Sequence, residues 1–133
     1  MMNAKNMSVE TFYSKHASLF DQRIGSLNLY NQSYSSFVQD AKNKRTLLDL
    51  ACGPGNVSMF IKSLVPEIEI TCVDIAENML NIAKSKLQAV KCYKSDILNI
   101  QIPHSIFDII TCAFGLPYID KKDIATFVSE IDK

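Results

Sequence analysis

The sequence has no excess of charge of either sign, since 14 lysines and arginines balance 14 aspartates and glutamates among its 133 residues. Without surplus positive charge, a protein gains little from nucleic-acid phosphates or from an anionic membrane surface. An apolar segment near the first residue is also absent, as is any run of about eighteen apolar residues, so we expect neither export nor a membrane span. These absences indicate a cytoplasmic protein that binds no nucleic acid.

A pair of cysteines in the CxxC spacing of metal and redox sites is missing as well. Each cysteine lies within or at the end of an apolar run, which favours free buried thiols over disulfides or metal ligands. The cysteines are Cys52, Cys72, Cys92 and Cys112. We therefore predict no metal site, and we interpret their regular spacing as coincidental.

The chain does contain, after residue 45, short apolar runs that alternate with helical segments. The runs are bounded by Gly, Pro, Asp or Asn, and the segments between them have apolar residues at three- and four-residue steps. The predicted strands are Thr46–Ala51, Glu69–Val73, Val90–Lys94 and Phe107–Ala113, and the predicted helices are Val57–Val65, Glu77–Gln88 and 122–133. This alternation predicts an α/β fold with a mostly parallel sheet covered by helices on both faces.

Two helices are predicted before the first strand. The apolar residues of Ser8–Arg23 follow an amphipathic helical period, and a weaker period covers Leu29–Lys42. A basic segment, Lys42–Arg45, follows. We therefore predict two parts, an N-terminal helical cap or lid in residues 1–45 and a ligand-binding α/β domain in residues 46–133.

The first predicted strand leads into a glycine-containing loop between Asp49 and Asn56. Gly53 and Gly55 can adopt positive φ, and without a Cβ they let a ligand approach the backbone. Asn56 is a good N-cap for the next helix, whose first N–H groups would face the same ligand. An ordinary strand-to-helix turn would have the same features, so the loop alone leaves both interpretations open.

Two acidic residues end the next two strands. Asp74 follows Gly53 by 21 residues, and its carboxylate can either accept hydrogen bonds from both hydroxyls of a ribose or serve as a helix N-cap. Asp96 can accept from the exocyclic amine of adenine, with Ile97 against the ring, or it can face solvent in a turn. Because ligands of parallel sheets bind beyond the carboxyl ends of the strands, the three features together predict an adenosine site.

Four segments resemble the motifs of class I S-adenosylmethionine-dependent methyltransferases. They are LLDLACGPGNVS (47–58), VDIAENML (73–80), YKSDILNI (93–100) and FDIITCAFGLPYI (107–119). The first is similar to the family's glycine-rich motif, with Ala51 in place of its first glycine. Within the family the resemblance is to the ubiquinone/menaquinone biosynthesis C-methyltransferases, although Pro117 and Tyr118 stand here in place of the usual Arg-Asn.

The resemblance implies a Rossmann-like three-layer sandwich with strand order 3-2-1-4 and a site for S-adenosylmethionine or its product S-adenosylhomocysteine. It implies that the glycine loop approaches the methionine part, that Asp49 orders this loop and the amino group, and that 113–115 lies near the methyl group. The implied cofactor-binding residues are Tyr13, Asp49, Ala51, Cys52, Gly53, Gly55, Asp74, Ile75, Met79, Asp96, Ile97, Ala113, Phe114 and Gly115. Tyr13 and Phe20 would form an aromatic lid over the cofactor, or Tyr13 would be a core residue of its helix.

The implied reaction is transfer of a methyl group to a small-molecule acceptor. This in-line displacement requires the protein mainly to position the reactants and exclude water. A base is needed only where the acceptor must first lose a proton, and the candidates are Tyr13, His16, His104 and Tyr118. A histidine in a surface loop, such as His104, is more often solvated than catalytic, so we assign no catalytic residue.

Two departures from the family bear on function. The chain ends where the family continues into three further strands, which predicts either a fragment or a homodimer that covers an exposed fourth strand. The crossover Ile97–Ile106 is short, contains Pro103 and shows no helical period, so we expect a loop in place of the usual helix. We therefore expect cofactor binding more readily than turnover.

Two other functions stay open. A nicotinamide-dependent oxidoreductase also combines a glycine loop with an acidic residue about twenty positions later, but the third glycine of that fingerprint is absent and Asp49 would repel a pyrophosphate. The alternative without catalysis is a methyltransferase-like module that binds a partner through its open sheet edge.

Overall fold

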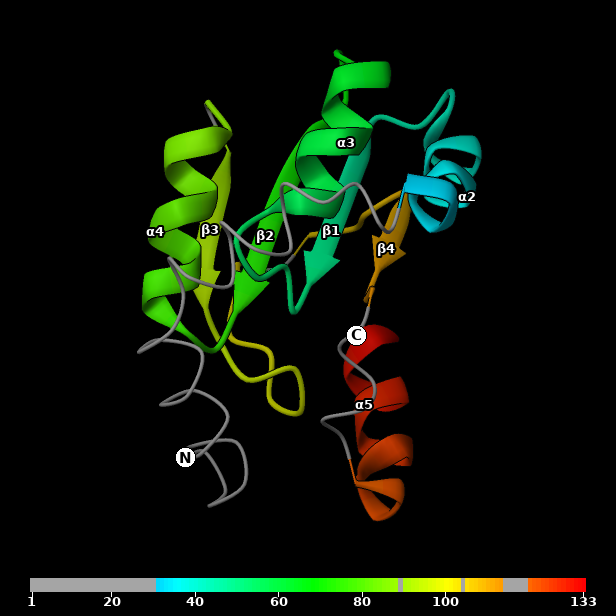
Figure 1. The fold of residues 1–133 in the computed structure, drawn as a ribbon. Helices are drawn as coiled ribbons and strands as arrows, with labels where there is room; N and C mark the ends of the chain where they lie inside the picture. The colour runs from blue at the N-terminus through cyan, green and yellow to red at the C-terminus, as the bar shows by residue number, and fades with distance from the viewer. Residues whose placement is uncertain (1–30, 89, 104, 114–119) are drawn as a thin grey trace.

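The computed structural model describes residues 31–88, 90–103, 105–113 and 120–133 (Figure 1). Its elements are α2 (Asn31–Ala41), β1 (Thr46–Leu50), α3 (Asn56–Leu64), β2 (Glu69–Asp74), α4 (Glu77–Lys86), β3 (Lys91–Lys94), β4 (Ile109–Thr111), the short 3-10 helix η3 (Lys121–Asp123) and α5 (Ile124–Ile131). These confirm the predicted strands and the helices that fall on described residues, with bounds that differ by a few residues. The helix predicted over Ser8–Arg23 lies outside the described residues. None of the helices in the described part of the chain is long and apolar enough to cross a bilayer.

The strands of the described residues form one parallel sheet in the order β3-β2-β1-β4. β1 pairs along its whole length with β2, and β4 pairs with the other side of β1. β2 also pairs with β3, so the carboxyl ends of β1, β2 and β3 lie at one edge of the sheet. Both the strand order and the parallel direction confirm the prediction.

Apolar side chains alternate along β1 and build two cores. Leu47 packs with residues of α2, α3 and α4, including Ile61, in what we term the α3-side core. Leu48 and Leu50 point to the opposite face, where Phe127 of α5 and apolar residues of segment 97–107 form the α5-side core. Figure 1 shows α3 and α4 lying across the same face of the sheet. Both faces are thus covered, and the predicted three-layer arrangement is confirmed.

Polar contacts explain why β4 begins later than the predicted Phe107. The Asp108 carboxylate accepts hydrogen bonds from the N–H groups of Arg45 and Thr46, at 2.8 and 3.1 Å. These two N–H groups lower the pKa of Asp108. The Asp108 N–H donates in turn to the Thr46 hydroxyl at 3.0 Å. Side-chain contacts therefore replace the strand ladder at this point, and β4 begins only at Ile109.

The segment between β3 and β4 is a loop, as predicted, and its own polar groups hold it in shape. Asp96 and Asn99 form an isolated antiparallel bridge. The Ser95 hydroxyl accepts a hydrogen bond from the Gln101 N–H at 2.8 Å and donates to the Asn99 carbonyl at 3.2 Å. These contacts satisfy backbone groups that a helix would otherwise pair internally.

Helix α2 is packed into the α3-side core. Its residues Val38 and Ala41 are buried together with residues of α3 and α4. The basic segment that follows forms a turn in which Asn43 has a φ of 65°. The division of the chain into a cap of residues 1–45 and a domain of residues 46–133 stays a prediction.

Two of the cysteines lie on neighbouring strands, and a third follows the strand beside them. Cys72 of β2 stands opposite Cys92 of β3, and the N–H of Cys52, just after β1, donates to the Val73 carbonyl. The regular spacing is close to the length of one strand and helix, and our interpretation of it as coincidental stays a prediction. Cys52 and Cys72 are buried as predicted, whereas Cys92 and Cys112 are half-buried. Within the described residues no group of three or more His, Cys, Asp or Glu side chains is arranged to hold a metal ion.

Candidate cofactor-binding site

The turn between β1 and α3 has an uncommon backbone. Ala51, Gly53 and Gly55 have positive φ values of 53°, 55° and 89°. A Cβ added to Gly53 would meet no atom within 4 Å, whereas one added to Gly55 would lie 3.2 Å from side-chain atoms of both Ala83 and Leu87. Gly53 therefore leaves room for the predicted ligand. Gly55 lets α3 pack closely against α4, a role that the sequence did not reveal.

The start of α3 differs from the prediction. Gly55 occupies its N-cap position, and Asn56 is its first helical residue. The predicted capping role of Asn56 is therefore wrong. Its side-chain oxygen instead accepts a hydrogen bond from the Lys86 ammonium at 3.1 Å, which joins α3 to the last turn of α4.

Asp49 lies beneath this turn and is only 1% exposed. Its carboxylate accepts hydrogen bonds from the Ser58 hydroxyl at 2.5 Å and the Thr111 hydroxyl at 3.3 Å. Burial raises the pKa of Asp49 to about 6, against the lowering effect of the two hydroxyls. The side chain thus joins β1 to α3 and β4. This contact fits the loop-ordering role that the resemblance implied, and contact with a cofactor amino group stays a prediction.

Asp74 joins the end of β2 to the turn after β1. One of its carboxylate oxygens accepts a hydrogen bond from the Gly53 N–H and the other from the Ala76 N–H, both at 2.8 Å. Burial raises the pKa of Asp74, whereas these N–H groups lower it. Ala76 is the N-cap of α4, so the alternative that Asp74 is that cap is wrong. A carboxylate offers about four lone-pair sites, so Asp74 can accept from ribose hydroxyls in addition.

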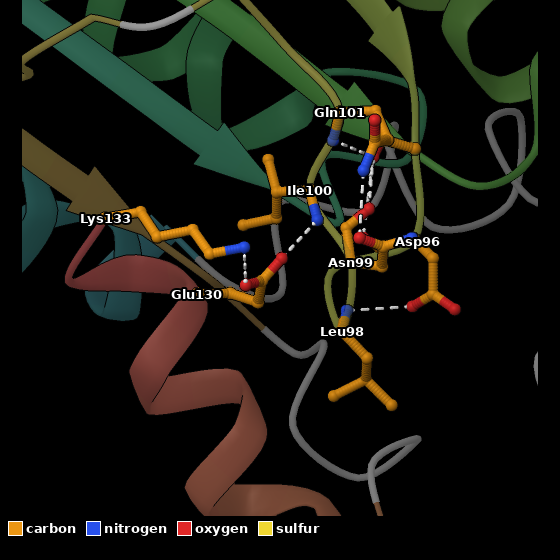
Figure 2. Close-up of polar contacts among 8 residues, drawn as sticks. Asp96, Leu98, Asn99, Ile100, Gln101, Glu130 and Lys133 are labelled. Atoms are coloured by element: carbon orange, nitrogen blue, oxygen red, sulfur yellow. Dashed lines mark hydrogen bonds and ion pairs between the residues drawn. The ribbon is translucent and has the colours of Figure 1, made fainter.

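Asp96 lies in the loop that follows β3, at the same edge of the sheet (Figure 2). The Ser95 N–H donates to the Asp74 carbonyl at 3.0 Å, which places the start of this loop beside the end of β2. An Asp96 carboxylate oxygen accepts from the Leu98 N–H at 2.9 Å, and Ile97 is half-buried against the α5-side core. The structure therefore brings these residues next to Asp74, as the strand ends predicted. Their contacts with adenine stay predictions.

The other predicted residues fall into three groups. Ala51, Ile75 and Ala113 are half-buried. Cys52 and Met79 are buried, and Met79 packs with Ala76 and Ile82 on one side of α4. The predictions for Tyr13, His16, Phe20, His104, Phe114, Gly115 and Tyr118 lie outside the described residues.

Sequence reasoning missed three residues that shape this region. Ser58 and Thr111 hold the Asp49 carboxylate, and Glu130 of α5 accepts a hydrogen bond from the Ile100 N–H at 2.7 Å. Ser58 gave a usable signal, because it lies on the first turn of α3 among apolar core residues. Glu130 gave none, because it lies 30 residues from its partner, in a helix that packs in the α5-side core through Phe127 and Ile131.

The site carries a concentration of negative charge. The charge of Asp74 contributes to the raised pKa of Asp49, after the larger effect of burial. The donors to both carboxylates that the structure describes are neutral hydroxyl and N–H groups. A positively charged ligand is stabilised in such a potential, whereas a pyrophosphate is repelled.

The fold defines the chain as a Rossmann-like α/β domain, and the strand-end carboxylates form a candidate ligand site at the carboxyl edge of its sheet. Residues 47–133 match the family model of the methyltransferase domain, so the chain belongs to this methyltransferase family.

Curated relatives have methyltransferase names. The demethylmenaquinone methyltransferase of Thermotoga maritima is 35% identical over 114 residues, which cover 76% of this chain and 49% of that protein. The ubiquinone/menaquinone biosynthesis C-methyltransferase of Saccharophagus degradans is 27% identical over 119 residues, which cover 84% of this chain and 48% of that protein. The chain spans about a third to a half of the length of the curated relatives that it matches.

Solved structures show the same fold. A DhpI–SAH complex matches with a TM-score of 0.79 at 19% identity, over 98% of this chain and 64% of that chain. An S-adenosylmethionine-dependent methyltransferase from Clostridium acetobutylicum matches with a TM-score of 0.65 at 27% identity, over 90% of this chain and 52% of that chain. These similarities confirm the Rossmann-like methyltransferase fold.

Proposed function

We propose that the chain is the S-adenosylmethionine-binding portion of a methyltransferase that transfers a methyl group to a small-molecule acceptor. Family membership supports the class of reaction. The Asp74–Gly53 hydrogen bond carries the cofactor assignment, because it fixes a ribose-binding carboxylate beside a glycine with open space at its α-carbon. Solved neighbours named as complexes with SAH or SAM support the same cofactor.

The residues at the strand ends fit this cofactor along its length. Gly53 offers backbone without a Cβ for the methionine part, and Asp74 accepts from the ribose hydroxyls. Asp96 accepts from the exocyclic amine of adenine, with Ile97 beside the ring. The sulfonium is positively charged, and the buried carboxylates of Asp49 and Asp74 supply a matching negative potential.

The chemistry that S-adenosylmethionine supplies is a methyl group on a positively charged sulfur, which is already a good leaving group. The protein residues therefore bind and orient rather than form bonds. Asp74 accepts a hydrogen bond from Gly53 in the turn after β1, and Asp49 ties β1 to α3 beyond this turn, so the methionine part meets a preformed backbone. Positioning of this kind contributes by raising the effective concentration of the reactants and by excluding water.

Two further parts of the proposal concern partners and location. β4 is the last strand of the sheet that the described residues form, and its outer edge supports pairing with a second copy of the chain. Native mass spectrometry tests this, since a homodimer would double the mass and a purely monomeric spectrum would contradict it. A cytoplasmic location belongs to the same proposal.

A nicotinamide-dependent oxidoreductase is less well supported, because the family match and the buried carboxylates both favour a cationic adenosyl ligand. Thermal unfolding with each ligand separates the two functions. Millimolar S-adenosylhomocysteine is expected to raise the Tm of the chain by several degrees, since a ligand that binds only the folded state stabilises it. NADH is expected to have no effect. Stabilisation by NADH alone would overturn the proposal.

A module without turnover would bind the cofactor as an enzyme does but would not transfer its methyl group. Transfer of the label from radiolabelled or deuterated S-adenosylmethionine to candidate acceptors therefore distinguishes the two. Methyl transfer that depends on Asp74 would support an enzyme, whereas ligand binding without transfer to any acceptor would support the module.

A further inference from the structure

Glu130, on the last turn of α5, places a carboxylate inside the protein. Its side chain is 7% exposed, and its two oxygens contact different partners. One carboxylate oxygen accepts a hydrogen bond from the Ile100 N–H at 2.7 Å, and the other pairs with the Lys133 ammonium at 2.5 Å (Figure 2). Lys133 first, and the Ile100 N–H second, lower the pKa of Glu130, so the group is ionised at neutral pH.

The Ile100 N–H belongs to the loop that carries Asp96. Within this loop the Asp96 carboxylate accepts from the Leu98 N–H at 2.9 Å, and the Asp96 carbonyl accepts from the Asn99 N–H at 2.9 Å. Figure 2 shows these contacts on one side of Ile100 and the Glu130 contact on the other. A shift of Ile100 would therefore be transmitted through two or three residues of a tight turn to the Asp96 side chain.

The loop has two attachments to the rest of the fold at opposite ends. Its start is tied to β2 by the Ser95 N–H and the Asp74 carbonyl. Its far end is tied to α5 by Glu130, while Leu98, Ile100 and Ile102 pack in the α5-side core. Apolar packing is not directional, whereas a charged hydrogen bond fixes the position of one N–H group.

We propose that Glu130 is a positioning residue for adenine recognition, which fixes the Asp96 loop through the Ile100 N–H so that Asp96 and Ile97 can read the base. The inference rests on the proposed S-adenosylmethionine site. It adds to that site a residue from α5, which has no described contact with the glycine turn, and it assigns α5 a role in specificity.

Four variants separate the hydrogen bond from the charge. Glu130→Gln keeps an oxygen acceptor for the Ile100 N–H and removes the ion pair. Lys133→Met removes the ion pair alone. Glu130→Leu removes the acceptor and leaves the Ile100 N–H without a partner. Glu130→Asp is a milder form of the third variant, because the shorter side chain withdraws the acceptor but keeps a carboxylate at this position, and it serves if Glu130→Leu does not fold.

The readout is the ratio of two dissociation constants, measured by calorimetry with the 133-residue chain. One ligand is S-adenosylhomocysteine, and the other is S-inosylhomocysteine, which has a carbonyl oxygen in place of the exocyclic amine of adenine. We expect the unaltered chain to prefer S-adenosylhomocysteine by about tenfold or more, because the carbonyl leaves an acceptor facing an acceptor. Glu130→Gln and Lys133→Met should keep this preference, whereas Glu130→Leu and Glu130→Asp should lose most of it.

The outcomes distinguish the inference from the function on which it rests. If the unaltered chain binds neither ligand, the proposed function fails and the inference fails with it. If it binds S-adenosylhomocysteine but Glu130→Leu and Glu130→Asp keep the full preference, or weaken both ligands equally, only the inference is overturned. Faster hydrogen exchange of the Ile100 amide in these two variants, together with lost preference, would support it.

Discussion

The carboxylate of Asp74 accepts a hydrogen bond from the backbone N–H of Gly53 at 2.8 Å, although the two residues are 21 positions apart. The contact joins the turn after β1 to the end of β2 and so fixes the geometry of the site before any ligand binds. Because Gly53 has open space where a side chain would be, the acidic group and the accessible backbone are presented together. This pre-organisation lowers the entropy that ligand binding would otherwise cost.

Asp49 makes stability depend on pH. Burial raises its pKa from 3.8 to about 6, so the folded state binds the proton more tightly than the unfolded state does. The contribution of Asp49 to the free energy of unfolding is therefore greatest below about pH 4 and declines as the pH rises to about 6. The side chain of Asp49→Asn cannot ionise. Its amide oxygen can accept from one of the Ser58 and Thr111 hydroxyls, and its NH2 group can donate to the other once that hydroxyl has rotated.

We expect Asp49→Asn to gain stability relative to the unaltered chain as the pH rises. A difference of about two pKa units corresponds to a relative gain of about 3 kcal/mol between pH 4 and pH 7. Urea unfolding at pH 4.5, 6 and 7.5 measures it, and the other carboxylates cancel in the comparison. A difference in unfolding free energy that stays constant over this range would show that Asp49 is not buried as described.

The two glycines of the turn are expected to respond differently to alanine. Gly53→Ala adds a methyl group into open space and costs only the strain of a left-handed backbone, about 1 to 2 kcal/mol. Gly55→Ala adds the same strain and a contact at 3.2 Å with Ala83 and Leu87, so it should cost about 2 to 4 kcal/mol.

Gly53→Ala, the variant that costs less stability, should lose more ligand affinity than Gly55→Ala. It is expected to weaken the binding of S-adenosylhomocysteine by tenfold or more, on the order of the 1.4 kcal/mol that a blocked approach would cost. Chemical denaturation and calorimetry on both variants provide the measurement. Equal affinity in Gly53→Ala and the unaltered chain would mean that the ligand does not approach this backbone.

The thiols are expected to differ in reactivity. Contact with the Cys72 thiol lowers the pKa of Cys52, but burial and the nearby Asp49 and Asp74 carboxylates outweigh it and raise the pKa to about 11. Iodoacetamide at pH 8 should therefore leave Cys52 and Cys72 unmodified in the folded chain and modify them after denaturation. Mass spectrometry of the peptides identifies each site, and modification of Cys52 at the rate of half-buried Cys112 would contradict the described packing.

Much of the fold follows from local patterns in the sequence. The alternation of buried strands and amphipathic helices predicts parallel strands joined by crossovers, and the observed sheet has the strand order that the family resemblance implies. Asp74 could be identified because it ends a strand that neighbours the glycine turn. The residue at which β4 begins could not be predicted, because it depends on the contacts of Asp108 with Arg45 and Thr46, more than 60 residues earlier.

The wrong role predicted for Asn56 and the packing role of Gly55 that the sequence did not reveal have a common physical reason. Asn56 has a side chain suited to capping α3, but its oxygen accepts a hydrogen bond from the Lys86 ammonium, at the C-terminal end of α4. Gly55 was predicted to approach a ligand, but its missing Cβ also makes room for Ala83. In each case a contact between two helices decided the role, and such contacts leave no mark in the spacing of residues along one segment.

The most direct test of the cofactor assignment is calorimetric titration of S-adenosylhomocysteine into the chain and into Asp74→Ala. Asp108→Ala is the matched control. The Asp108 carboxylate also accepts hydrogen bonds from two backbone N–H groups, but it lies at the amino ends of the strands, away from the candidate site. We predict saturable binding by the chain and by Asp108→Ala, and a loss of at least tenfold in affinity for Asp74→Ala. Absence of heat at millimolar ligand with folded chain, or equal affinity in Asp74→Ala, would contradict the assignment.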